Sequence, residues 1–179
     1  MLQFEKLPKT ELLKILDAYA KAWQAMDSSY FLALEEKYGL DAARAVDIEA
    51  WRRFSPIEAN RIMQEFNIPK NSGLEGLKRA LQYRVYARLN KQSIQDVDKH
   101  RFVFRMEECR IQVARKRKGL PDFPCKPVGI VEYSEFARTI DPRIKTRCVA
   151  CPPDAHPEEY WCAWEFTLEE NSGKASKPT

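Results

Sequence analysis

The residues best suited to chemistry are five cysteines, and all of them lie after residue 108. Three fall close together: Cys148 and Cys151 form a Cys-x-x-Cys pair that two prolines follow, and Cys162 comes shortly afterwards. A Cys-x-x-Cys pair on a tight turn presents two thiolates together, and such a pair binds a soft metal ion or acts as a redox couple. The segment is therefore predicted to carry thiol chemistry.

A complete metal site needs further ligands, and two more cysteines are available. Cys125 lies between prolines at the start of a predicted helix, where the helix N-terminus favours the thiolate. It is the candidate fourth ligand beside Cys148, Cys151 and Cys162, and Cys109 is the substitute. Four thiolates accept either Zn²⁺ or an iron–sulfur cluster, and the choice stays open. The alternative for each cysteine is a buried, unreactive thiol.

Other polar residues near the cysteines are weaker candidates. His156 lies in the loop after the Cys-x-x-Cys pair, where it could bind the metal, carry a proton near neutral pH, or simply face solvent. His100 precedes a predicted strand, and we expect no role in the site for it. Gln112 and Arg115 would share one face of the helix that follows the first cysteine, so we expect them to flank the site.

The first half of the chain has the periodicity of helices. Over residues 9–38 apolar residues recur every three or four positions, and short polar residues at 27–29 could divide this stretch in two. Further helices are expected over residues 41–54, 55–66 and 74–89. The third of these four stretches would begin at a capping box, with Ser55 before Pro56 and Glu58 three residues on. We therefore expect a helical region over residues 1–98.

After Asp98 the period changes to that of a strand. Apolar residues alternate with other residues from Phe102 to Met106, as in a strand with one face on a core. Helices are then expected over residues 109–118 and 128–140, and two antiparallel neighbouring strands over residues 144–150 and 160–168. The expected fold is α+β, with an N-terminal helical array followed by a small antiparallel sheet with helices. Its Cys-rich α+β region would span residues 99–168, with a flexible tail over residues 169–179.

Composition narrows the class of protein. The 179 residues carry a formal net charge of +4, and no run approaches the roughly 20 apolar residues of a membrane span. We expect a cytoplasmic protein without membrane contact. In the cytoplasm its thiols would stay reduced. The basic run 115–118 suits a solvated helix face, so nucleic acid is not an expected partner. The apolar helical half leaves room for a homodimer interface. The sequence contains no glycine-rich phosphate-binding loop and neither the G-x-S-x-G nor the H-E-x-x-H motif of hydrolases.

The order of the cysteines supports a resemblance to known proteins. Residues 102–168 follow the outline of a strand, a helical segment that carries a cysteine, another helix, and a closing hairpin with a cysteine on each strand. The cysteines of this outline are Cys109, Cys125, Cys148 and Cys162. The most specific strings are Phe123-Pro124-Cys125-Lys126 and Cys148-Val-Ala-Cys151-Pro-Pro-Asp154. This outline resembles the 4-vinyl reductase domain and the L-2-amino-thiazoline-4-carboxylic acid hydrolase-like proteins. The resemblance implies an α+β ligand-binding fold, small-molecule binding and a zinc ion held by cysteines. The closing hairpin differs, since residues 151–157 replace a short Gly-Asp turn.

Two functions of different class follow. The first is a Cys-rich metal-binding protein with a pocket for a small-molecule ligand. The second is a hydrolase that opens a small heterocycle with a Cys nucleophile or a metal-bound water, and with His156 or a nearby Glu as base. A closed four-thiolate site would indicate structure and an open position would indicate catalysis. A third reading is a helical interaction protein whose cysteines are independent.

Overall fold

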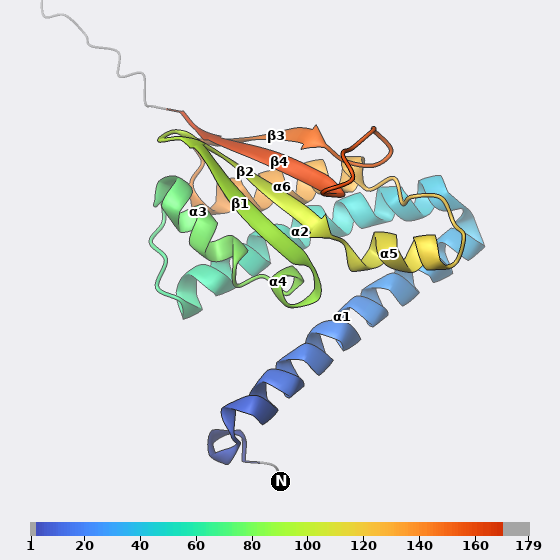
Figure 1. Cartoon of the computed structure of the whole chain (residues 1–179), viewed down its shortest axis with the longest axis horizontal. Helices are drawn as coiled ribbons and strands as arrows, with labels where there is room; N and C mark the ends of the chain where they lie inside the picture. Colours follow the sequence, from blue (N-terminus) through green and yellow to red (C-terminus); the bar gives the residue numbers. More distant parts are fainter. Residues whose placement is uncertain (1–2, 170–179) are drawn as a thin grey trace, which may run out of the picture.

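Two long helices begin the fold. The computed structural model describes residues 3–169, and a short 3₁₀ helix, η1 (Phe4–Lys6), precedes α1 (Lys9–Tyr38) and α2 (Leu40–Glu65). Gly39 joins the two with a φ of 85°, a conformation that glycine adopts at little cost, so the chain turns in one residue. The N-terminal half of α1 projects from the body of the molecule, and its C-terminal half lies against the other helices (Figure 1).

Both helices run through positions where the sequence predicted a boundary. At residues 27–29 the chain stays helical, and Ser29 does not cap a new helix, since its Oγ donates a hydrogen bond back to the Ala25 carbonyl at 2.7 Å. The predicted start at Ser55 is wrong, since α2 continues through Pro56. Glu58 does not close a capping box there, because its carboxylate pairs with Arg84. Packing of α2 along a later helix stabilises the continuous form.

The rest of the first half contains two short helices and an unpredicted strand. α3 (Gly73–Leu81) and α4 (Tyr86–Leu89) replace the single helix expected over residues 74–89. β1 (Lys91–Asp98) follows, so the helical region predicted to residue 98 ends at Leu89. β1 is an edge strand that is exposed over much of its length, and it therefore lacks the apolar alternation that reveals a strand in a sequence.

The second half forms an antiparallel sheet with helices. β2 (Arg101–Glu108), β3 (Ile144–Ala150) and β4 (Cys162–Leu168) join β1 in the order β1-β2-β4-β3. α5 (Arg110–Arg117) and α6 (Lys126–Ile140) lie between β2 and β3 in the chain. The predicted α+β class is confirmed, and the strands expected over residues 144–150 and 160–168 do pair antiparallel, although β4 begins at Cys162.

The inner face of the sheet carries the core. Phe102, Phe104 and Met106 of β2 point inward beside Trp164 and Phe166 of β4, and all five are buried. α6 packs against this face, and α2 packs along α6, so the molecule has a sheet layer and two helical layers behind it (Figure 1). Alternate residues of the strands face inward, which explains how β2 could be predicted from its two-residue period.

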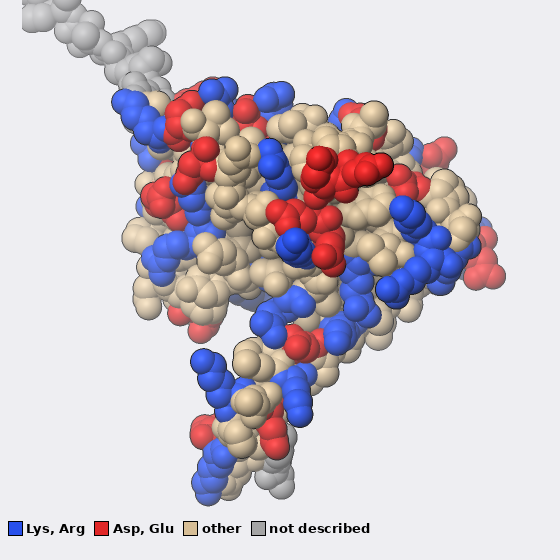
Figure 2. Space-filling model, viewed as in Figure 1, with Lys and Arg blue, Asp and Glu red and all other residues tan. Residues whose placement is uncertain are grey.

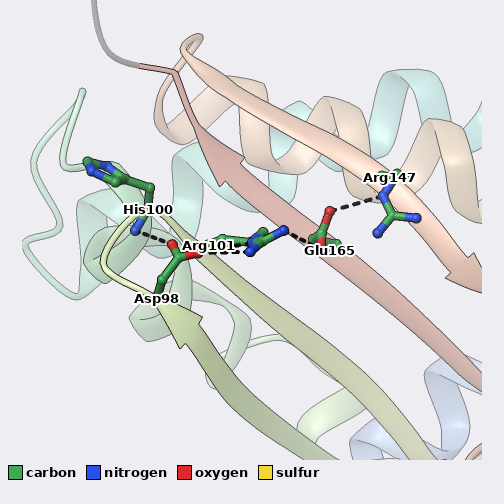
Figure 3. Close-up of polar contacts among 5 residues, drawn as sticks. All are labelled: Asp98, His100, Arg101, Arg147 and Glu165. Atoms are coloured by element: carbon green, nitrogen blue, oxygen red, sulfur yellow. Dashed lines mark hydrogen bonds and ion pairs between the residues drawn. The ribbon is translucent and has the colours of Figure 1, made fainter.

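The outer face of the sheet is polar. Arg101 of β2 bonds to Asp98 with its Nη2 at 2.9 Å and has its Nη1 3.9 Å from Glu165 of β4. Arg147 of β3 donates from Nε to the other Glu165 oxygen at 3.0 Å, and the His100 backbone N–H donates to Asp98 at 2.9 Å (Figure 3). Charges of opposite sign thus alternate across the four strands, from Asp98 of β1 to Arg147 of β3. Because these pairs are exposed, each contributes little to stability, and the row mainly keeps this face in water.

A buried ion triad joins the helical layers. Arg84, between α3 and α4, donates from Nε to Glu58 of α2 and places Nη1 beside Glu132 of α6, both at 2.8 Å. All three side chains are buried, and the guanidinium also lies 4.7 Å from the centre of the Phe136 ring. A buried charge is tolerated when it is paired, so this triad fixes the spacing between α2 and α6.

Candidate functional site

A cleft of about 280 Å³ lies between the C-terminal half of α1, the helix α5 and one end of the sheet. Its walls are largely apolar, and aromatic rings from different elements close it: Phe31 of α1 meets Phe123 edge to face with 5.0 Å between ring centres. Lys and Arg side chains gather around α5 (Figure 2), and Arg110 and Arg115 of this helix line the cleft. A concave site of this size and character suits a small organic molecule.

Strand pairing brings three cysteines to this end of the sheet. Cys162 opens β4 opposite Met106 of β2, Cys109 follows the end of β2, and Cys151 follows the end of β3. Cys125 joins them from the N-terminus of α6, where it occupies the N-cap position. All four cysteines line the cleft. The sequence analysis expected Cys125, Cys148, Cys151 and Cys162 to converge, with Cys109 as the substitute; the cleft lining contains Cys109 in place of Cys148.

The sulfur atoms of Cys125 and Cys151 lie 3.5 Å apart, within hydrogen-bond distance. The hydrogen bond from Cys151 lowers the pKa of Cys125 against the opposing effect of burial, and the Gln112 amide, 3.6 Å from Cys125 Sγ, lowers it further. The same contact, a second one from Cys162, and burial raise the pKa of Cys151. Burial raises the pKa of Cys109 to about 12. Cys125 is therefore the thiol that these contacts favour as thiolate.

Two of the predicted site residues lie elsewhere. Cys148 is not among the residues that line the cleft: it lies opposite Trp164 within β3, the strand predicted over residues 144–150, whereas Cys151 follows the end of that strand. Burial raises the pKa of this thiol. His156 is also absent from the cleft lining: its ring lies 5.1 Å from that of Trp161, and its Nε2 is 3.9 Å from Asp122.

The two residues predicted to flank the site do line the cleft. Gln112 is 1% exposed, and its amide holds the loop before α6: Nε2 donates to the Phe123 carbonyl and Oε1 accepts from the Phe123 N–H, both at 2.9 Å. Arg115 Nε donates to the Pro121 carbonyl at 2.8 Å. Together these bonds fix the segment that delivers Cys125 to the thiol cluster.

The thiols were tested for their fit to a metal ion. Over residues 3–169, no group of three or more His, Cys, Asp or Glu side chains is placed so that it could hold one. The contacts among the thiols link Cys125 to Cys151 and Cys151 to Cys162, whereas a structural zinc uses four donors around one point. The arrangement as it stands does not fit a four-thiolate zinc or iron–sulfur site. The metal stays a prediction from the sequence.

The cleft also contains a group of carboxylates that the sequence analysis missed. Asp27 of α1, Asp47 of α2 and Glu132 of α6 line it together. Burial, then the charges of Asp27 and Glu132, raise the pKa of Asp47 to about 7, although a hydrogen bond from Trp51 opposes this shift. Burial also raises the pKa of Asp27. Within residues 3–169, no Lys, Arg or His forms an ion pair with Asp27 or Asp47.

One further polar side chain stands out beside these carboxylates. Gln24 lies one turn before Asp27 on α1, lines the cleft and is 5% exposed. Its Nε2 has no hydrogen-bond partner among the described residues. The sequence did contain a signal for polar residues in this cleft. Glu132 interrupts the apolar positions of its helix between Val128 and Phe136, and a lone charge among apolar residues indicates a partner or a site.

Fold and site together define an α+β protein with a thiol- and carboxylate-lined cleft between a helical pair and the end of an antiparallel sheet. Within the described residues, no helix combines the length and the apolar character that crossing a membrane requires. The chain belongs to the family of unknown function DUF6125, which it matches over residues 5–168. No curated protein and no solved structure matches it. The family match covers both halves of the fold, so the helices and the sheet belong to one family unit.

Proposed function

We propose that the protein binds a small organic cation, an amine on an apolar skeleton, in this cleft. The observation that carries the proposal is the pair Asp27 and Asp47, which line a largely apolar cleft and have no cationic partner among the described residues. Removing a carboxylate from water without a partner is costly. An ammonium group of a ligand would supply the missing charge, and the apolar walls would cover the rest of the molecule.

The surroundings of the carboxylates support this ligand class. Trp51 and Tyr86 line the same part of the cleft, and aromatic rings attract cations. Arg84 already lies over both rings, and the rings stack on each other, so a ligand would meet only the ring atoms that line the cleft. The unpartnered amide of Gln24 would donate to an acceptor near the amine. The ligand we propose therefore carries an ammonium group with a hydroxyl or carbonyl nearby.

Calorimetry with matched ligands tests the proposal. Small aromatic and aliphatic amines would be compared with alcohols of the same shape and with the corresponding carboxylates. We expect the amines to bind more tightly, and Asp47→Asn and Asp27→Asn to weaken amine binding about tenfold or more, which corresponds to about 1.4 kcal/mol. Asp41→Asn is the matched control, since Asp41 is an exposed carboxylate of α2 paired with Arg44. Equal binding of amines and alcohols would overturn the proposal.

A hydrolase is the second candidate because Cys125 combines the helix N-terminus, two hydrogen bonds to sulfur and a place in the cleft. Asp47 or Glu132 would then act as base, since His156 is not in the cleft lining. The test is incubation with L-2-amino-thiazoline-4-carboxylic acid, followed by chromatography. Turnover that Cys125→Ser abolishes would support this candidate, and an unchanged substrate would count against it.

The predicted metal has its own test. Elemental analysis of protein purified without oxygen would detect zinc or iron, and the Cys151→Ser variant would show whether the cleft thiols hold it. About one ion per chain, lost in that variant, would support the Cys-rich metal-binding protein inferred from the sequence. Cys148→Ser is the informative comparison, because Cys148 is not in the cleft lining.

A further inference from the structure

The segments that carry Cys125 and Cys151 are already joined next to each sulfur. The Lys126 N–H, one residue after Cys125, donates to the Pro152 carbonyl, one residue after Cys151, at 2.9 Å. The Lys126 ammonium also pairs with Asp154. These contacts hold the start of α6 against the end of β3. The two cysteine backbones therefore stay neighbours whatever their side chains do.

The two thiols are also close and differ in reactivity. Their sulfur atoms lie 3.5 Å apart, so a bond of about 2.05 Å requires a movement of about 1.5 Å, which side-chain rotation within the joined segments can supply. The helix N-terminus and the hydrogen bonds from Gln112 and Cys151 favour the thiolate of Cys125. Cys151 keeps its proton, because its contacts with Cys125 and Cys162 raise its pKa. The sulfur of Cys125 is thus suited to attack an oxidant first, and the sulfur of Cys151 to react with the oxidised Cys125 in a second step.

We infer that Cys125 and Cys151 form a redox pair, which closes to a disulfide when hydrogen peroxide enters the cleft. The Cys125 thiolate attacks one peroxide oxygen, the O–O bond breaks, and with one proton the other oxygen leaves as water, which gives a sulfenic acid. Cys151 then attacks this sulfur, the S–O bond breaks, and its proton leaves with the hydroxyl as a second water. The two thiols lose two electrons and two protons, and the peroxide is reduced to two waters.

The remaining cysteines do not compete on equal terms. Burial raises the pKa of Cys109 to about 12, which leaves almost no thiolate near neutral pH. Cys148 is not part of the cleft lining. Cys162 contacts Cys151, so an exchange to a Cys151–Cys162 bond is the one alternative pairing that the contacts allow. The inference is independent of the proposed amine ligand, because it concerns the wall of the cleft and not its occupant.

Peptide mapping of the oxidised full-length protein tests the inference. The reduced chain is first treated with a chelator, so that no bound metal shields the thiols, then exposed to equimolar hydrogen peroxide, alkylated and digested without reductant. We expect free thiols to fall from five to three, a Cys125–Cys151 cross-linked peptide by mass spectrometry, and reversal by dithiothreitol. A map without that peptide, or one dominated by another pairing, would overturn the inference even if all variants failed to fold.

Variants then assign the order of the two steps. Cys125→Ser should slow the loss of thiols about tenfold or more, because the reactive thiolate is gone. Cys151→Ser should leave a sulfenic acid on Cys125 that a dimedone reagent traps. Cys148→Ser is the matched control and should oxidise as the wild type does. Circular dichroism of each variant establishes that it is folded, and oxidation of folded Cys125→Ser at the wild-type rate would contradict the assigned order.

Discussion

Substituting Gly129 by alanine tests how tightly α6 packs on the sheet behind the cleft. A Cβ at Gly129 would lie 2.5 Å from Cζ2 and 2.9 Å from Cη2 of Trp164. Real Cβ atoms essentially never come so close to another atom, so a neighbour must move. Trp164 is 1% exposed and packs within the core, where it cannot swing into solvent. The methyl group must therefore push α6 away from β4 or force the indole into a strained position.

The expected cost follows from two opposing effects. Adding a methyl group to a filled core costs about 1–3 kcal/mol. Alanine, however, is a better helix former than glycine by about 1 kcal/mol, and Gly129 lies inside α6. Because a contact of 2.5 Å is severe, we take the upper half of that range, about 2–3 kcal/mol, and the net expectation is a loss of roughly 1–2 kcal/mol in the free energy of unfolding. Ile130→Ala, at a more exposed position of the same helix, should change stability by less than about 0.5 kcal/mol.

Urea unfolding followed by circular dichroism at 222 nm measures these changes, and a double-mutant cycle identifies their cause. In a Trp164→Phe background the two indole carbons are absent. Gly129→Ala should then cost nothing, or stabilise by up to about 1 kcal/mol through helix propensity. The coupling energy between the two positions would be about 2 kcal/mol. An equal loss in both backgrounds, or no loss in the wild type, would refute the argument from steric contact.

Three further outcomes are expected. Arg84→Met should destabilise the protein by about 3–5 kcal/mol at pH 7, because it leaves two glutamates buried without a partner, and urea titrations should show a smaller loss at pH 5, since burial raises the pKa of Glu132 and favours its protonated form. The pKa of Asp47 is about 7 in the folded state and near 4 in the unfolded state, so the stability that it contributes at low pH is lost as pH rises through 7. The melting temperature should therefore fall between pH 5 and 8, and Asp47→Asn should make it depend less on pH. Iodoacetamide at pH 7.5 should label Cys125 well before Cys109 in timed peptide mass spectra, because contacts lower the pKa of Cys125 and burial raises that of Cys109 to about 12.

The parts of the fold that could be predicted are those in which one face of a helix or strand is buried, because apolar residues then recur at a regular spacing in the sequence. β3 was predicted with its observed limits, and β2 was recognised, because their inward residues alternate with outward ones. β1 was missed because an exposed edge strand needs no apolar face. The break expected at Ser55 followed a local rule that a partner distant in the chain overrides, since Glu58 bonds to Arg84 instead of the backbone.

Some residues of the candidate site could also be predicted from the sequence, and others could not. The thiols at the ends of β2 and β3 and the start of β4 could be brought together from the order of strands, since antiparallel neighbours share an end. The strand that carries Cys148 was predicted, but its absence from the cleft was not, because the cleft lining depends on how several elements pack together, which a sequence does not show. Asp27 and Asp47 belong to two different helices, and a sequence does not state the rotation at which two helices pack, so their approach to the cleft was not predictable.

The order of the strands also bears on how the protein is made. β4 lies in the middle of the sheet, yet it is the last of the described strands to leave the ribosome, and β3 pairs with β4 alone. Until residue 168 is available, β3 has no ladder to join, and the long-range contacts that place Cys109, Cys125 and Cys151 around Cys162 cannot form. The nascent chain therefore carries its reactive sulfur atoms dispersed and unprotected. The cleft can therefore assemble only after β4 has been synthesised, and until then the thiols depend on the reducing capacity of their surroundings.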